Sequence, residues 1–304
     1  MITWPEATVM RLLAAAGIFL VAALYARGWR RLPRPLPSRA IRSAVVDPAS
    51  NRALVLFVAG LALLAVALIS PLGYLATQYF SARIIQHMLV VASVPSLLML
   101  ANPIPALIHG LPGRQRDALL RGLRRPVDKT SSRTRRAIHW ATSPGVTLIA
   151  FLSVCWFWYD PLMHSATLRY SLVHAIELLS LFGVGLLNWW HITAAWPQTH
   201  HAMHPLVRIL YAFISIWPVK LVGLALLFFP GMSYGYPATF QFSGLDINDY
   251  SFGAMIAWIV SGLAYAVAAV ALARQWLGEE ADKPALPESA WATDESMNVP
   301  GIKR

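Results

Sequence analysis

The sequence predicts an all-α polytopic membrane protein, built as a bundle of seven transmembrane helices. Of the 304 residues, 57% are hydrophobic and only 13% are charged, and the mean hydropathy is +0.53. These values lie well outside those of a soluble domain of this length. Seven stretches are apolar enough to cross a bilayer, which takes about 20 residues each. They lie near residues 7–26, 52–70, 84–108, 144–158, 169–190, 205–229 and 252–273.

The stretches differ in how clearly they are bounded. The first begins after a polar start and lacks a basic n-region, so we expect a retained helix and not a cleaved signal peptide. The fourth is short, and Ile138, Trp140 and Ala141 can extend it.

Residues 277–304 are polar, rich in proline and short of aliphatic side chains, which is typical of disorder. We therefore expect a seven-helix domain over residues 1–276 and a disordered cytoplasmic tail over residues 277–304.

The basic residues alternate between the connections. Seven arginines lie between the first two helices and nine Lys or Arg between the third and fourth, whereas the alternate connections hold only Arg83 and Arg169. The positive-inside rule then places the N-terminus outside and the C-terminus in the cytoplasm. Because this topology explains the net charge of +11, the expected partner is the lipid bilayer, and no nucleic acid is expected.

Three histidines fall on the outer side in this topology. His87 lies at the outer end of the third helix, His164 in the turn after the fourth, and His174 in the first turns of the fifth. Imidazole binds copper, zinc, iron or nickel, and the thioethers of Met88 and Met163 would favour Cu(I). The alternatives are that these groups form hydrogen bonds between helices, or that His87 and His174 hold a haem.

Two charges lie inside the membrane at similar depth. Glu177 is three residues after His174, hence on the same helix face, and about 12 Å from the outer end. Lys220 on the sixth helix reaches about the same depth. A lone charge there is costly, so we predict that Glu177 and Lys220 pair. In the alternative, the ammonium of Lys220 extends outward to water.

A second group of histidines lies on the cytoplasmic side, where His191 precedes the loop that carries His200, His201 and His204. It is a weaker copper or zinc candidate, and these histidines could equally cap the sixth helix or face solvent. The single cysteine, Cys155, excludes an intramolecular disulfide. Because the sequence contains no nucleophile with its base, no paired carboxylates and no cofactor motif, we do not expect an enzyme.

The segment at residues 70–105, SPLGYLATQYFSARIIQHMLVVASVPSLLMLANPIP, resembles the hallmark segment of the CtaG-like cytochrome c oxidase assembly factors, which are associated with caa-type oxidases. Three further segments agree: WYDP at 158–161, HAIE at 174–177 and DYSFGAMIAW at 249–258. Their order and spacing cover most of the membrane domain. Beside His87, His174 and Glu177, the resemblance singles out Pro71, Gln86, Pro161, Asp249 and Trp258.

The resemblance implies a multi-pass protein of the bacterial plasma membrane that helps a haem–copper oxidase to mature, with oxidase subunits as partners and copper provision as the expected task. One alternative is a partner that stabilises oxidase subunits without metal. Another is a transporter that uses Glu177 and Lys220, with the helix breaks at Pro95 and Pro218 as moving parts.

Four positions depart from the family pattern. The family commonly has His where this chain has Arg83, Tyr159 and Leu178, and Gln where it has Tyr250. The missing imidazoles would be neighbours that complete a metal site. In addition, a fixed positive charge at Arg83, one helical turn before His87, repels a cation. These departures indicate a divergent member in which copper binding is weakened or absent.

Overall fold

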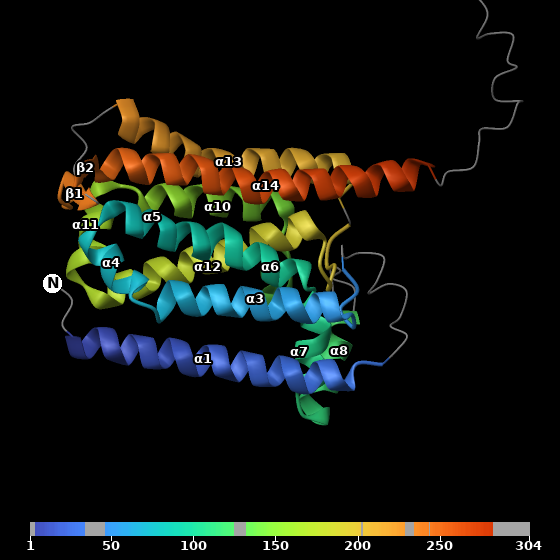
Figure 1. Cartoon of the computed structure of the whole chain (residues 1–304). Coiled ribbons are helices and arrows are strands. Elements are labelled where there is room, and N and C mark those ends of the chain that lie inside the picture. Colours follow the sequence, from blue (N-terminus) through green and yellow to red (C-terminus); the bar gives the residue numbers. More distant parts are fainter. Residues whose placement is uncertain are drawn as a thin grey trace, which may run out of the picture.

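The computed structural model describes residues 4–33, 46–124, 132–201, 203–228, 234–242 and 244–281. Figure 1 shows a bundle of roughly parallel helices, with α1 along one edge and α13 and α14 along the other. In the described part, six helical runs are long and apolar enough to cross a membrane: α1 (Trp4–Arg31), α3 (Asn51–Leu68), the run Phe80–Leu100, α12 (Ser171–Thr193), α13 (Pro205–Phe228) and α14 (Asp249–Ala281). The all-α polytopic fold is thereby confirmed.

The seventh span is a bent pair of helices. Helix α9 (Arg133–Ala141) and α10 (Pro144–Trp158) meet at 64°, so they count as one span only if the bend is included. Pro144 is the first residue of α10, and Ser143 before it is extended, with ψ at 149°. A residue before proline is pushed out of the helical region. For this reason Ile138 and Trp140 belong to a separate helix and do not prolong α10.

The third span starts and ends earlier than the sequence predicts. It consists of α5 (Phe80–Met88), one π-helical turn over Leu89–Ser93 and α6 (Val94–Leu100). Asn102 is left-handed, with φ at 48°, and Pro103 follows it, so the chain turns into the short helix α7 (Ile104–Gly110). A left-handed residue followed by proline is a common helix end.

The π turn has a local cause in Pro95, which has no N–H to give to the carbonyl of Val91 and whose ring crowds it. Helix α12 passes close to this carbonyl. A Cβ placed on Gly185 of α12 would stand 2.7 Å from the Val91 oxygen, so only glycine permits the approach. The proline therefore shapes the contact between the third span and α12.

Helix α1 makes its closest contact at one end of the bundle, with α7. A Cβ on Gly28 would stand 1.7 Å from the Ala106 oxygen of α7, and one on Gly110 would stand 2.2 Å from the Leu24 oxygen. These glycines let the two backbones touch. Toward its start, α1 is largely exposed, as Leu12 and Leu13 illustrate, at 64% and 62%. The basic helix α8 (Gly113–Arg124) follows α7 at the same end (Figure 1).

The opposite end, where α1 begins, is built from short elements (Figure 1): α4 (Leu72–Gln78), α11 (Pro161–Arg169) and an antiparallel hairpin of β1 (Thr239–Phe242) and β2 (Leu245–Asn248). We call it the N-terminal end. The hairpin turns at Gly244, with φ at +81°, and was not predicted. Helix α14 starts directly after it and reaches Ala281, so it includes the first five residues of the predicted tail. Residues 282–304 lie outside the described part.

Candidate functional site

A buried ion pair joins α5 to α12 near the N-terminal end. Nη2 of Arg83 lies 2.6 Å from Oε2 of Glu177, and both side chains are fully buried. The same Nη2 donates a hydrogen bond to the hydroxyl of Thr167 in α11. Arg83 thus ties three elements together, and a buried carboxylate is satisfied by a charge-assisted hydrogen bond.

Two of the predicted metal-binding histidines flank this pair. Nδ1 of His174 lies 3.0 Å from Nη1 of Arg83 and 3.1 Å from Oε2 of Glu177. When Nδ1 carries no proton, it accepts a hydrogen bond from the guanidinium of Arg83. When Nδ1 is protonated, it donates one to the carboxylate of Glu177. Nε2 of His87 lies 3.2 Å from Oε1 of Glu177, although neither atom has a partner with hydrogen-bond geometry. His87, His174 and Glu177 therefore do converge.

His164 lies beside His87, with the two ring centroids 6.4 Å apart. Its Nε2 is 3.3 Å from the Tyr236 hydroxyl and its Nδ1 is 3.4 Å from the Trp158 carbonyl. Burial, and then the positive charge of Arg83, lower the pKa of His164 from its ordinary 6.5 to about 3. This imidazole is neutral at physiological pH. The fourth candidate ligand, Met88, packs in the hydrophobic core.

The predicted pair of Glu177 with Lys220 is wrong. Glu177 is taken by Arg83, and Nζ of Lys220 donates to the carbonyl of Trp258, 3.0 Å away, while lying 4.2 Å from the centre of its ring. The pairing fails because α13 is rotated about its axis so that Lys220 faces α14. The cation that faces Glu177 of α12 comes from α5 instead. A cation over an aromatic face is stabilised without a carboxylate.

The arrangement around Arg83 does not suit a copper ion. A guanidinium is always charged, and that of Arg83 already contacts both Nδ1 of His174 and Oε2 of Glu177. The pair is already neutral, so a cation would add an uncompensated buried charge. In the part of the chain that the structure describes, no group of three or more His, Cys, Asp or Glu is arranged to hold a metal.

Two family-motif positions hold the site in place. Asp249, the first residue of α14, accepts from the backbone N–H groups of Phe80 at 2.5 Å and Ser81 at 3.0 Å. From there it caps the start of α5. Nε2 of Gln86 donates to the Ala67 carbonyl at 2.8 Å and fixes α5 against α3.

The remaining motif positions have local roles. Pro71 precedes α4 as its N-cap, Pro161 opens α11, and Trp258 contacts Lys220. At two of the departing positions, phenols take up polar contacts. Tyr159 lies 3.4 Å from Nδ1 of His87, and Tyr250 accepts from the backbone near Tyr236.

Sequence reasoning missed Thr167 and Tyr236. Thr167 accepts from Arg83, and Tyr236 joins His164 to the Ala76 carbonyl of α4 at 3.0 Å. Both belong to connections that carry no periodic pattern. By contrast, Arg83 could have been placed, because it lies one turn before His87 and therefore faces the same neighbour.

The second group of histidines lies at the opposite end of the bundle, where His139 of α9, which was not part of the predicted group, joins it. His200 stacks on His139, with ring centroids 4.1 Å apart, and burial, followed by that neighbour, lowers its pKa. His191 contacts the Thr142 carbonyl at 3.0 Å. His201 is exposed, and His204 accepts from the N–H of Leu206 at the start of α13. Of the alternatives to metal binding, capping of the sixth helix fits His204 and exposure to solvent fits His201.

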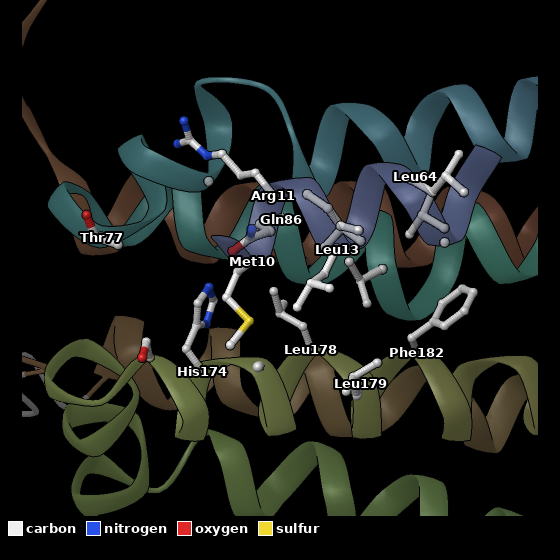
Figure 2. Close-up of a pocket in the computed structure, with 18 of the residues that line it drawn as sticks. Met10, Arg11, Leu13, Leu64, Thr77, Gln86, His174, Leu178, Leu179 and Phe182 are labelled. Carbon is white, nitrogen blue, oxygen red and sulfur yellow. The ribbon is translucent and has the colours of Figure 1, made fainter. Parts of the chain in front are cut away.

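A cavity of about 1300 Å³ reaches the site from the side of the bundle. Figure 2 shows Met10, Arg11 and Leu13 on one wall and His174 and Leu178, the latter a departing position, on the other. The His174 side chain is 16% exposed, whereas Arg83 and Glu177 are fully enclosed. The cavity therefore meets the polar site at His174.

Comparison with known proteins gives a match over most of the chain. The family model described as cytochrome c oxidase caa3 assembly factor (Caa3_CtaG) matches residues 23–279. No curated protein and no solved structure matches.

Proposed function

The chain belongs to the cytochrome c oxidase caa3 assembly factor family, and from that premise we propose that it assists oxidase assembly through contacts with oxidase subunits and not by carrying copper. The observation that supports this proposal is the Arg83–Glu177 pair, in which a fixed guanidinium already neutralises the buried carboxylate. The role is non-catalytic. The expected location is the bacterial plasma membrane, with the N-terminal end of the bundle outside.

The polar site then has a structural task in this function. Its hydrogen bonds join α5, α11 and α12, and Asp249 joins α14 to α5. Short elements at a membrane surface have little buried area of their own, so polar cross-links determine their relative positions. A fixed arrangement at this end offers an oxidase subunit a preorganised surface, which lowers the cost of ordering on binding.

Copper as cargo is the second candidate. It is favoured by Nε2 of His87 and Oε1 of Glu177, two buried atoms without hydrogen-bond partners that lie 3.2 Å apart beside His164. Imidazole nitrogen is a good ligand for copper. This candidate requires that Arg83 leave its place when the ion binds. The transporter alternative has lost the Glu177–Lys220 pair on which it depended.

The two candidates are separated by Arg83→Met/Glu177→Leu, which removes both charges and the carboxylate ligand while keeping an apolar volume. We expect the purified double variant to fold and to restore oxidase activity in a deletion strain, because Asp249 and Gln86 still hold α5 and no buried charge is left unpaired. Wild-type protein, titrated with Cu(I) against a colorimetric chelator, should bind no stoichiometric ion. One equivalent of Cu(I) that the wild type binds and His87→Gln/His174→Gln does not, together with no oxidase activity in Arg83→Met/Glu177→Leu, would establish the cargo role and refute the contact proposal.

A further inference from the structure

The lateral cavity has the form of a slot between α1 and α12. Helix α1 approaches α7 closely around Gly28 and Gly110, whereas residues of its first half line this space. Figure 2 shows the walls: Leu13 and Met10 come from α1, Leu179 and Phe182 from α12. The volume of about 1300 Å³ exceeds the roughly 300–1,000 Å³ of sites for small molecules. Such a slot suits a long apolar chain.

Among the described residues that line the cavity there are two arginines and no carboxylate. Arg11 on α1 and Arg169 at the end of α11 both line it. Arg11 is partly buried and lies in the first turns of a transmembrane helix, yet the described residues supply it with no ion pair. A charged side chain at such a position is costly unless it reaches water or an anion. Two arginines at one end of an apolar slot therefore favour an anionic ligand.

Gln86 supplies a second polar observation. Its side chain is 1% exposed and lines the cavity, and Nε2 is used by the Ala67 carbonyl. Because that bond fixes the amide orientation, Oε1 is left buried without a hydrogen-bond partner. Gln86 lines the same cavity as Arg11 and Met10, and Figure 2 labels all three. An unsatisfied buried acceptor costs free energy that a donor on a ligand would recover.

We propose that this cavity binds an anionic phospholipid, with its phosphate between Arg11 and Arg169 and an acyl chain along Leu13 and Leu179. Arginine binds phosphate oxygens bidentately, and both wall residues are open to the bilayer, at 62% and 70% exposure. A headgroup hydroxyl donates to Oε1 of Gln86. A helix of a partner protein satisfies the apolar walls but leaves the two arginines and the glutamine unmatched.

Native mass spectrometry of the full chain, reconstituted with equal amounts of phosphatidylglycerol and phosphatidylcholine, tests the charge requirement. We expect one phosphatidylglycerol to be retained, and roughly fivefold weaker retention for each arginine removed in Arg11→Gln and Arg169→Gln. Arg274→Gln is the matched control, since this arginine is exposed on α14 and does not line the cavity. Equal retention of the two lipids, or equal loss in the control, would overturn the proposal.

Tryptophan substitutions that fill the slot test whether the lipid binds there. Leu13→Trp should abolish retention, whereas Leu12→Trp, at a neighbouring position with similar exposure that does not line the cavity, should not change it. A second pair on α12 guards against misfolding of α1: Leu179→Trp fills the slot, and Leu172→Trp, exposed at 64%, does not. Thermal unfolding confirms that each variant folds. Identical retention within both pairs would refute the site, and because no oxidase is present the result is independent of the assembly role.

Discussion

Removing the carboxylate of Glu177 should destabilise the protein more than any change at Lys220. In Glu177→Gln, the fully buried guanidinium of Arg83 loses its counter-charge. Breaking a buried pair in this way costs about 3–5 kcal/mol, and the Coulomb energy of charges 4 Å apart, about 4 kcal/mol at an effective dielectric constant of 20, agrees. At about 2 °C per kcal/mol, the melting temperature should fall by roughly 6–10 °C.

The assay is thermal unfolding of the detergent-purified protein, followed by the fluorescence of its 12 tryptophans. Arg83→Met and the double variant Arg83→Met/Glu177→Gln complete a double-mutant cycle, in which the double variant should recover most of the loss. Lys220→Met is the control and should cost less than about 1 kcal/mol, since it removes only a contact with Trp258. Equal effects of Glu177→Gln and Lys220→Met, or additive single losses, would refute the assignment of the pair.

Three further changes test other parts of the structure. Asp249→Ala leaves the first two amides of α5 without an acceptor and should cost about 2 kcal/mol, with a smaller loss for Asp249→Asn, both measured by thermal unfolding. Gly28→Ala forces α1 off α7 and should cost about 1–3 kcal/mol, whereas Gly17→Ala, with open space around it, should be neutral; equal effects would contradict the close contact. His164 has a lowered pKa of about 3, so between pH 6.5 and 3 the unfolded chain binds a proton that the folded protein does not, and stability falls as the pH falls. Relative to His164→Gln, the wild type should lose up to about 1.4 kcal/mol per pH unit in this range, and parallel pH profiles would exclude a buried neutral imidazole.

The helices of the bundle could be predicted because a chain in lipid must satisfy its backbone hydrogen bonds within each segment, so apolar length alone locates the spans. Their ends could not be predicted as well. The left-handed Asn102 and the bend before Pro144 depend on tight local geometry that hydropathy does not describe. The β-hairpin was missed because two strands of four residues carry too short an alternating pattern.

For the site, helical spacing and topology were enough to bring His87, His174 and Glu177 to one region. They were not enough to choose the partner of Glu177. That choice depends on how each helix is rotated about its axis, which depth alone does not determine. The pairing of Arg83 was missed because we counted it among the charges of an outer connection, whereas it is fully buried.

Helix α5 connects these findings, because polar contacts from three directions fix it. Asp249 of α14 holds its first amides, Glu177 of α12 holds Arg83, and the Ala67 carbonyl of α3 holds Gln86. His87 also lies on this helix and is buried against Glu177 and Tyr159, so a substitution there would disturb α5 whether or not copper binds. Loss of oxidase in a His87 variant therefore cannot distinguish the two candidate functions. A variant that removes both charges can, because Asp249 and Gln86 still hold α5 while the carboxylate that a copper ion would need is gone.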